Sequence, residues 1–379
     1  MKKLFMIVNE DIFFLSHRKD IAVRAATDGF DVTVVASDTG HAEEVRALGL
    51  RFVALPINKT GLNISEELRT FRFLYSLIRK ERPDVVHLVG MKIILWGGLA
   101  SRLLGVRGIV SSISGLGVMF SPEFSKGIRK VMAWGVLAVM RFIHRRKNVF
   151  CVFHNRENME LFVRKGLAVR ESCVMTNGSG IDLDMFRYVP EPSSGRIRVL
   201  FTARMVEDKG VLVLLEAAER LRKEYEEKAE FVLCGGLETN PLAITRERLE
   251  SLCDGSYISW LGRRNDIRQQ LEQCHVFAFP SYYMEGLPKS CIEAAAVGRP
   301  IITCDWTGCR DAVEDGVTGF LIPAKDSGAL ADKLRLLIED ETLRTRMGRA
   351  SRAFAEKNFS VDDVVKVHLD MYNRLVLAE

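Results

Sequence analysis

Short apolar runs alternate with amphipathic segments of helix length along the whole chain. Nine of these runs have the near-continuous apolar character of strands that are buried on both faces. They span residues 3–8, 31–37, 84–89, 108–113, 148–153, 197–203, 229–235, 275–280 and 299–304. Amphipathic segments such as 65–82 and 91–104 lie between them. Strands that alternate with helices are typical of parallel sheets with helices on both faces, so the pattern predicts an α/β protein.

The alternation breaks once, at residues 189–196, where the sequence VPEPSSGR gathers prolines, serines and a glycine. Such a cluster indicates a linker. A chain of 379 residues is also longer than one hydrophobic core usually supports. We therefore predict two doubly wound, Rossmann-like domains, residues 1–188 and 196–358. The segment 361–377 is expected to pack back on the first domain. In such folds ligands bind beyond the carboxyl ends of the strands, so we expect the two domains to face a cleft that holds the site.

Composition narrows the class of protein. Hydrophobic residues make up 47% and charged residues 27% of the chain, as in ordinary folded proteins. The net charge of +5 conceals an asymmetry, because residues 1–195 carry 28 Lys and Arg against 19 Asp and Glu. This excess is either scatter or the mark of an anionic partner of the first half. The basic residues are not interleaved with aromatic ones along a groove-like motif, so a nucleic-acid partner is not expected.

Eight cysteines occur without a CxxC pair. Several lie in strand-like runs, which favours structural thiols in a reducing cytoplasm over a metal site or a disulfide framework. The amino terminus, MKKLFMIVNED, has fewer apolar residues than a secretory signal requires. We expect it to form a buried first strand.

Two cations follow the strand at 197–203, in the stretch ARMVEDKGV. Arg204 stands at the carboxyl end of the strand, and Lys209 stands where the next helix begins. A guanidinium that binds two oxygens beside a mobile ammonium suits a diphosphate. The alternative is a pair of solvated or helix-capping side chains.

The stretch YYMEGLPKSCIEAAAVGRPI holds two glutamates, Glu285 and Glu293, eight positions apart. We expect a helix to open at 286–288, with free backbone N–H groups near Gly286 and Leu287 forming an anion site. If both glutamates were helical, they would lie about 12 Å apart, which is too far for a glycosidase acid/base pair. The spacing fits two hydrogen-bond acceptors for one elongated ligand. The alternative is a buried Glu293 satisfied by backbone donors and a surface Glu285.

The segments FTARMVEDKG and FAFPSYYMEGLPKSCIEAAAVGRPIITCDWTGCRDAVEDGVTGFLI resemble the retaining glycosyltransferases of family four, which have the GT-B architecture. The resemblance covers nearly the whole chain and is strong in the second half. It rests on an E-x7-E motif, here Glu285 and Glu293, with an upstream arginine and lysine, here Arg204 and Lys209. It implies an acceptor-binding first domain and a second domain that binds a nucleotide-sugar donor. It also implies no metal and no cofactor besides that donor, which we expect to be a UDP-sugar.

The same resemblance implies a role for each donor-side residue. Arg204 and Lys209 would hold the diphosphate and stabilise it as it leaves, with Glu285 meeting hydroxyls of the transferred sugar. Glu293 would meet the ribose. WLGRRNDI at 260–267, with Arg263, resembles the nucleobase-side loop, and Gly235 and Gly236 resemble the donor-site glycines. No second carboxylate is placed as a nucleophile, so the chemistry is expected to rest on stabilisation of the leaving group. The retaining outcome of the family implies that the acceptor hydroxyl would attack from the face that the diphosphate leaves.

On the acceptor side the stretch of interest is NEDIFFLSHRKDI. Ser16 is expected to cap a following helix, which would place His17 and Arg18 in its first turn and expose Phe14 in the loop before it. In similar enzymes that build lipid-linked saccharides, a His-Arg pair lies beside the acceptor. The resemblance therefore assigns Asn9, Phe14, His17 and Arg18 to the acceptor, the alternative for His17 being a capping residue.

SSISGLGVMF at 111–120 supplies glycines where the first domain meets the expected cleft. Many family members have a histidine near this point, whereas this chain has Ser114 and Gly115, which we also assign to the acceptor side. The glycine spacing comes too late in the domain for a dinucleotide fingerprint, so a dehydrogenase is not expected. His87 ends a buried strand and is interpreted as structural.

The segment 126–147 combines a ten-residue apolar centre with basic residues at both ends. It is too short to cross a bilayer. With Trp134 it suits the surface of an anionic membrane, and the alternative is a core helix with solvated ends.

These observations predict a cytoplasmic enzyme, peripheral on the inner face of the plasma membrane. It would transfer a hexose or N-acetylhexosamine from a UDP-sugar to a polyprenyl-diphosphate-linked sugar in capsule, O-antigen or glycan assembly. A nucleotide-sugar epimerase on the same architecture, a transferase with a soluble acceptor, and a binding scaffold without turnover are the alternatives.

Overall fold

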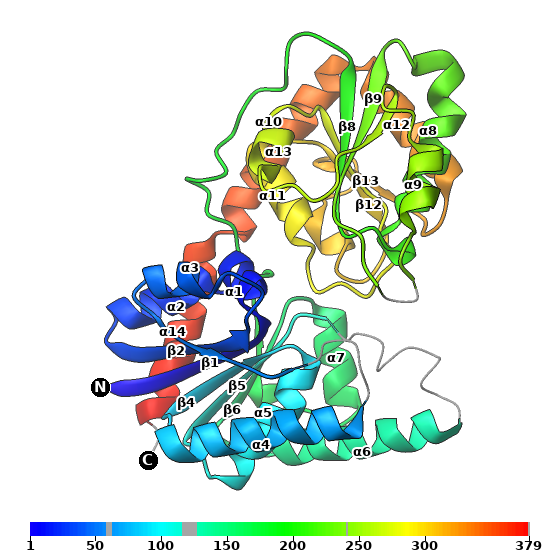
Figure 1. The fold of residues 1–379 in the computed structure, drawn as a ribbon. Helices are drawn as coiled ribbons and strands as arrows, with labels where there is room; N and C mark the ends of the chain where they lie inside the picture. Colours follow the sequence, from blue (N-terminus) through cyan, green and yellow to red (C-terminus); the bar gives the residue numbers. More distant parts are fainter. Residues whose placement is uncertain (58–62, 116–126, 240–241, 378–379) are drawn as a thin grey trace. The chain divides into compact units, whose positions relative to one another are not determined.

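The structure is a computed structural model that describes residues 1–57, 63–115, 127–239 and 242–377, with only the backbone described at 127–132. The chain forms two compact units, Met1–Ser179 with Val361–Glu379, and Gly180–Ser360 (Figure 1). Each unit is built on a purely parallel sheet with helices on both faces. The predicted α/β class and the two Rossmann-like domains are therefore confirmed.

The first domain holds a seven-stranded sheet in the order β3-β2-β1-β4-β5-β6-β7. Its strands are β1 (Lys2–Glu10), β2 (Phe30–Ser37), β3 (Arg51–Ala54), β4 (Val85–Val89), β5 (Gly108–Ile113), β6 (Val149–Phe153) and β7 (Cys173–Met175). Its helices are α1 (Asp11–His17), α2 (Lys19–Thr27), α3 (Ala42–Ala47), α4 (Ile64–Glu81), α5 (Met91–Leu103), α6 (Gly127–His144), α7 (Arg156–Arg164) and α14 (Val361–Leu377), with a 3-10 turn at Arg170–Ser172.

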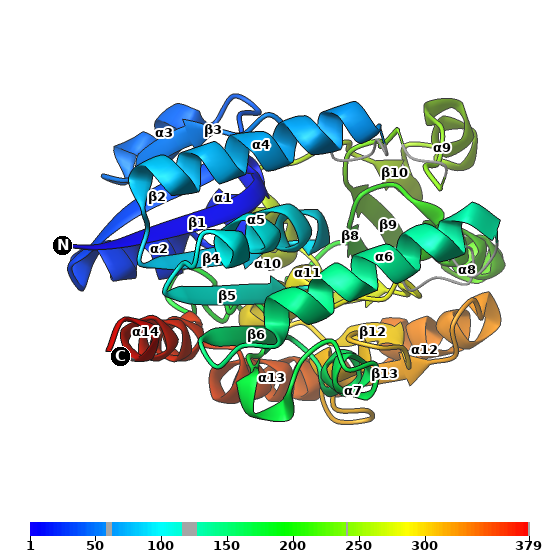
Figure 2. The same ribbon diagram turned by 90° about the horizontal axis from the view of Figure 1, so that it is seen from below.

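Alternate residues of β1 face opposite layers of this domain. Leu4, Met6 and Val8 join the core beneath α2 and α14, which pack against each other. On the other face, Ile7 lies near Gly97 of α5, where an added Cβ would come within 2.7 Å of a Leu88 methyl. Figure 2 shows α4, α5 and α6 side by side along that face. The first strand is thus buried on both sides, as its apolar run predicts.

The second domain holds a six-stranded sheet in the order β10-β9-β8-β11-β12-β13. Its strands are β8 (Ile197–Thr202), β9 (Ala229–Cys234), β10 (Ile258–Trp260), β11 (Val276–Phe279), β12 (Ile301–Cys304) and β13 (Gly319–Ile322). Its helices are α8 (Val211–Tyr225), α9 (Arg246–Leu252), α10 (Ile267–Glu272), α11 (Lys289–Val297), α12 (Ser327–Glu339) and α13 (Glu341–Asn358), with 3-10 turns at Glu207–Lys209 and Arg310–Ala312. The strand order reverses between β8 and β11, so the carboxyl ends of these two strands mark the topological switch point.

All nine predicted strands are present, and each of the four strands without a predicted counterpart is an edge strand. These are β3, β7, β10 and β13. Each has only three or four residues, and each includes residues that are not fully buried. A short strand with one open edge carries little apolar signal, which explains why the pattern did not show it.

The boundary between the domains lies at residues 179 and 180, before the predicted linker at 189–196. The segment before the prolines is tied into the second domain by backbone hydrogen bonds. Ile181 N–H donates to Phe359 O at 2.8 Å, and Val189 N–H donates to Val297 O at 3.2 Å. Residues 180–188 therefore extend the second domain rather than the first.

Helix α14 packs on the first domain through a buried polar cluster. The ring of His87 on β4 lies between the Tyr372 hydroxyl, 2.6 Å from Nδ1, and the Ser112 hydroxyl, 2.7 Å from Nε2. His368 stacks on His87 with ring centroids 5.2 Å apart. Burial lowers the pKa of His368 to about 3 and holds the pKa of His87 well below its usual range. The imidazoles are therefore neutral in the folded protein, and His87 is structural as predicted.

This cluster predicts acid sensitivity of the first domain. Below the unfolded-state pKa of about 6.5 the unfolded chain binds protons that the folded rings exclude, so stability falls by about 1.4 kcal/mol per pH unit for each ring. For His368 the loss runs from about pH 6.5 down to its folded pKa of about 3. We expect His368→Phe to flatten the dependence of the unfolding free energy on pH, measured by urea denaturation between pH 7 and 5. His41→Gln, at the surface of the same domain, is the control, and an unchanged slope in the His368 variant would contradict the prediction.

Candidate active site

The switch point of the second sheet brings together the loops that follow β8 and β11. Gly210, with φ +81°, lies so close to Pro280 that an added Cβ would be 2.0 Å from the Pro280 carbonyl oxygen. The backbone N–H of Tyr282 donates to Asp208 O at 2.9 Å, and the Ser281 hydroxyl lies 3.2 Å from the same oxygen. These contacts hold Lys209 and Glu285, one from each loop, against each other.

Lys209 and Glu285 form a largely buried ion pair. The ammonium contacts Oε1 of Glu285, and the two side chains are only 11% and 13% exposed. The Ser281 hydroxyl lies 3.3 Å from the same carboxylate oxygen. A carboxylate and an ammonium in this setting interact more strongly than a surface pair, and removal of either leaves a poorly solvated charge.

Arg204 lies at the same strand end, as the sequence predicts, but its side chain is 55% exposed and reaches Glu238 at 3.4 Å. Burial raises the pKa of Asp208, while the positive charges of Lys209 and Arg204 lower it and Glu285 raises it. Asp208 thus lies within electrostatic range of all three side chains. The structure therefore brings Arg204, Lys209 and Glu285 together, with Arg204 the most accessible of them.

Helix α11 begins at Lys289, later than the sequence indicates. Pro288 is the N-cap residue, with φ −64° and ψ 120°, and is not in the first turn. Gly286 and Leu287 consequently precede the helix, and Glu285 lies in the loop. Only Glu293 is helical, so the separation of about 12 Å expected for two helical glutamates does not apply to this pair.

Glu293 lies inside α11, where burial raises the pKa of its carboxyl and Lys289, 4.0 Å away, lowers it. Its side chain is 15% exposed. Burial raises the pKa of the Cys291 thiol well above its usual range, and the charges of Glu285 and Glu293 both raise it further. Both carboxylates therefore lie near the first turns of this helix.

A third loop closes on the Glu285 segment. Gly308, with φ +79°, lies so near that an added Cβ would be 2.6 Å from Glu285 O and 2.5 Å from Gly286 O. The Cys309 thiol lies 3.6 Å from Ser281 O. A larger residue at position 308 would displace the backbone that carries Glu285.

Gly235 and Gly236 follow β9, as the sequence indicates, beside the start of the segment 260–267. An added Cβ on Gly235 would lie 1.6 Å from Ala203 O, so only glycine fits. Gly235 N–H donates to Gly262 O at 2.8 Å, and Trp260 Nε1 donates to Gly235 O at 2.9 Å. A Cβ on Gly236 would lie 3.7 Å from Cβ of Arg263. Arg263 also lines a shallow pocket with Arg264, Asn265, Asp266 and Gln269.

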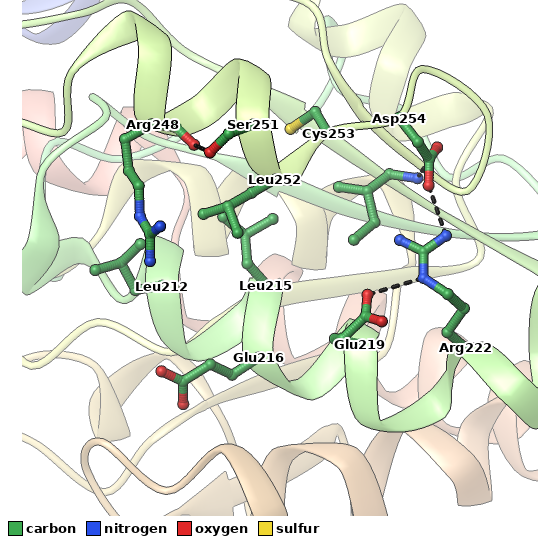
Figure 3. A pocket seen from close by; sticks show the side chains of 11 residues that line it. Leu212, Leu215, Glu216, Glu219, Arg222, Arg248, Ser251, Leu252, Cys253 and Asp254 are labelled. Carbon is green, nitrogen blue, oxygen red and sulfur yellow. Dashed lines mark hydrogen bonds and ion pairs between the residues drawn. The ribbon is translucent and has the colours of Figure 1, made fainter.

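Another pocket lies away from these loops, between α8 and α9 (Figure 3). Arg222 on its rim is held by Glu219 at 2.8 Å and by Asp254 at 2.6 Å. None of the predicted site residues lines it. This pocket therefore does not mark the predicted site.

The structure corrects the expected conformation of the stretch NEDIFFLSHRKDI. Residues 11–17 form α1, and the Ser16 hydroxyl donates to Ile12 O at 2.8 Å from within that helix, so Ser16 caps no following helix. Phe14 is fully buried in the core and is not an exposed loop residue. Arg18 lies between α1 and α2 and is only 1% exposed. Residues 12–15 are four consecutive apolar residues, and the expected loop is wrong because they belong to α1.

Burial excludes direct contact between the Arg18 guanidinium and a ligand at the surface in this conformation. One nitrogen donates to His17 O at 2.9 Å, and burial lowers the pKa of Arg18 to about 10. Its Nε and Nη2 have no hydrogen-bond partner among the described residues. The assignments of Phe14 and Arg18 as acceptor contacts are therefore not supported by their positions.

The other predicted acceptor-side residues lie at strand ends of the first sheet or at the end of α1. Asn9 is near the end of β1, 3.0 Å from where a Cβ on Gly90 would stand. His17 ends α1, with its ring stacked on Phe13 at 4.3 Å. Ser114 and Gly115 directly follow β5 and are half-buried, whereas residues 116–120 of that stretch lie outside the described residues.

The segment 126–147 forms α6 over Gly127–His144, with Lys126 outside the described residues. Met140, Ile143 and His144 are buried, whereas Trp134 is 70% and Phe142 46% exposed. The helix thus combines an inner face packed on the domain with apolar side chains on the surface. No helix in the described ranges has the length and hydrophobicity needed to span a bilayer.

Sequence reasoning missed Ser281 and Tyr283, which lie in the segment FAFPSYYMEG but carry no motif signal. The Lys209 ammonium stands 4.7 Å from the centroid of the Tyr283 ring. All eight cysteines are free thiols, and six are buried. Among the described residues, no group of three or more His, Cys, Asp and Glu side chains is arranged to bind a metal ion.

The chain is similar to known proteins in both halves. The profile of "Glycosyl transferases group 1" matches residues 186–354, and that of "Glycosyl transferase 4-like" matches residues 3–145. A Campylobacter jejuni protein, N,N'-diacetylbacillosaminyl-diphospho-undecaprenol alpha-1,3-N-acetylgalactosaminyltransferase, is 27% identical over 93% of this chain and 94% of its own. An Escherichia coli protein, UDP-Gal:alpha-D-GlcNAc-diphosphoundecaprenol alpha-1,3-galactosyltransferase, is 25% identical over 90% and 89%.

Among solved structures, Anabaena HepE in complex with UDP and glucose superposes with a TM-score of 0.78 at 16% identity, over 98% of this chain and 100% of that one. At this identity the likeness concerns the fold. The two matched profiles, the two Rossmann-like domains and the residues gathered at the β8–β11 switch point agree with one another. The chain belongs to the group 1 glycosyltransferases of the family-four type, which have the GT-B architecture.

Proposed function

We propose that this glycosyltransferase transfers a hexose or N-acetylhexosamine, with retention, from a UDP-sugar to a polyprenyl-diphosphate-linked saccharide. The observation that carries the proposal is the pairing of Lys209 with Glu285 at the switch point, with Arg204 beside them. Two relatives that align along most of the chain are named for acceptors linked to undecaprenol through a diphosphate, and one of them for a UDP-sugar donor.

On the donor side, Arg204 and Lys209 supply two positive charges for the diphosphate. The exposed Arg204 can bind phosphate oxygens from solvent, and the buried Lys209 acts as a fixed charge. Glu285 accepts hydrogen bonds from hydroxyls of the transferred sugar, and Glu293 accepts them from the ribose. Gly235, Gly236 and Arg263 border the nucleobase side.

The proposed chemistry is stabilisation of the leaving group. The bond between the anomeric carbon and the diphosphate oxygen breaks, and Arg204 and Lys209 stabilise the charge that develops on that oxygen. The acceptor hydroxyl forms the new bond on the same face and gives its proton to the departing diphosphate. Because the two side chains provide this positive charge, we propose that no metal ion is required.

On the acceptor side, Asn9, His17, Ser114 and Gly115 lie at the ends of α1 and of strands in the first domain and remain the candidates for saccharide contacts. Exposed Trp134 and Phe142 on α6 lie in the half of the chain that carries the basic excess. We propose that this helix rests on an anionic membrane surface at the cytoplasmic face, where a polyprenyl acceptor would be embedded.

The reaction is tested by release of nucleoside diphosphate from a panel of UDP- and GDP-sugars, with and without a polyprenyl-diphosphate-sugar and with a chelator present. We expect acceptor-dependent UDP release that persists in the chelator. Lys209→Ala should lower kcat by about 100- to 1,000-fold, as loss of one fixed donor to a developing charge does. Lys228→Ala, an exposed lysine of the same domain, is the matched control.

Other outcomes separate the alternatives. Conversion of the donor sugar without UDP release would indicate an epimerase. UDP release that requires a soluble saccharide rather than a lipid-linked one would overturn the proposed acceptor.

Membrane association is tested by co-sedimentation with vesicles that contain anionic phospholipid. Trp134→Ala should lower the bound fraction several-fold, because the indole is one of the apolar groups available to the headgroup region. Added salt should weaken vesicle binding of the unaltered protein and of the Trp134 variant. Leu336→Ala, which removes an exposed apolar side chain from the second domain, is the control. Equal binding of the Trp134 variant and the unaltered protein would count against α6 as the contact.

A further inference from the structure

The ammonium of Lys209 lies between a carboxylate and an aromatic face. It contacts Glu285 on one side, and it stands 4.7 Å from the centroid of the Tyr283 ring and 5.8 Å from that of Phe279. Only 9% of Lys209 is exposed. The aromatic face attracts the ammonium electrostatically, and this attraction is larger where water is excluded.

The Tyr283 ring is fixed by the loop that also carries Glu285. Tyr283 N–H donates to the Ser281 hydroxyl at 3.3 Å, and Tyr283 O accepts from Glu285 N–H at 2.8 Å. These are backbone contacts, so the position of the ring does not depend on its hydroxyl. A phenylalanine can keep the same arrangement, whereas an aliphatic side chain supplies no negative ring face.

The ion pair poses a problem for the proposed donor site. A diphosphate that binds Lys209 must compete with Glu285, and separation of a buried pair leaves both charges without compensation. Glu285 can turn to the hydroxyls of the sugar. Lys209 then needs a partner that does not compete with phosphate, and an aromatic face is such a partner.

We propose that Tyr283 is a positioning residue, whose ring holds the Lys209 ammonium in place while its anionic partner changes from Glu285 to the diphosphate of the donor. This inference rests on the proposed function, because it presumes that Lys209 binds a diphosphate. It also assigns Glu285 a second role, since its carboxylate competes with free nucleoside diphosphate for Lys209.

The experiment compares Tyr283→Phe with Tyr283→Leu by titration calorimetry with UDP. We expect the Phe variant to stay within about twofold of the unaltered protein and the Leu variant to bind UDP about tenfold more weakly, because only the latter loses the ring. Tyr283→Met should behave like the Leu variant, which keeps the test available if one of them folds poorly. Tyr282→Leu is the matched control, because that ring lies beneath Lys325, 4.8 Å away, and not beneath Lys209.

The second role of Glu285 gives an independent measurement. Glu285→Gln removes the competing charge, so the affinity of this variant for UDP alone should not fall, whereas its turnover with a UDP-sugar should fall.

Equal losses of UDP affinity in the Phe and Leu variants of Tyr283, or unchanged UDP affinity in its Leu and Met variants, would overturn the inference and leave the proposed function standing. Absence of UDP binding to the unaltered protein would overturn both.

Discussion

The close packing of two backbone loops at the ends of β8 and β11 is the constraint on which the second domain's site depends. Gly210 must be glycine because Pro280 O occupies the space of a side chain, and Gly308 must be glycine because Glu285 O and Gly286 O do. These contacts hold the Lys209 ammonium against the Glu285 carboxylate with 11% and 13% of the two side chains exposed. The pairing of these two side chains therefore depends on the packing of the backbone that carries them.

The central strands and the position of the donor-side residues could be predicted from the sequence because each leaves a strong local signal. Long apolar runs mark β1, β4, β5 and β8, and a charged residue directly after such a run must lie at the carboxyl edge of a parallel sheet. Edge strands such as β10 have only three residues, most of them only partly buried, and so give a weak apolar signal in the sequence. The start of α11 was misplaced because Pro288 can occupy either the N-cap or the first turn, and only tertiary contacts decide between these positions.

The acceptor side shows what such reasoning misses. Arg18 follows a histidine in a segment rich in polar residues, yet it is buried between two helices, since the turn between α1 and α2 points it inward. Tyr283 shows the converse, a residue near the site to which the sequence assigns no role. Nothing in SYYMEG distinguishes one tyrosine from the next. Only the folded structure shows that the Tyr283 ring lies beneath Lys209 and the Tyr282 ring beneath Lys325. Contacts between distant loops carry this information, and a linear pattern does not.

The hydrogen bond between His87 and Tyr372 joins residues 285 positions apart. During synthesis on the ribosome, the first domain therefore emerges before the Tyr372 partner of His87 has been made. The face of its sheet that α14 covers is then open to water. The second domain is contiguous in sequence and can complete its core while the first still waits. Amino-terminal domains usually finish folding first, but here the first domain is complete only once α14 has been made. A ribosome that stalls late in translation therefore leaves the first domain without the helix that completes its core.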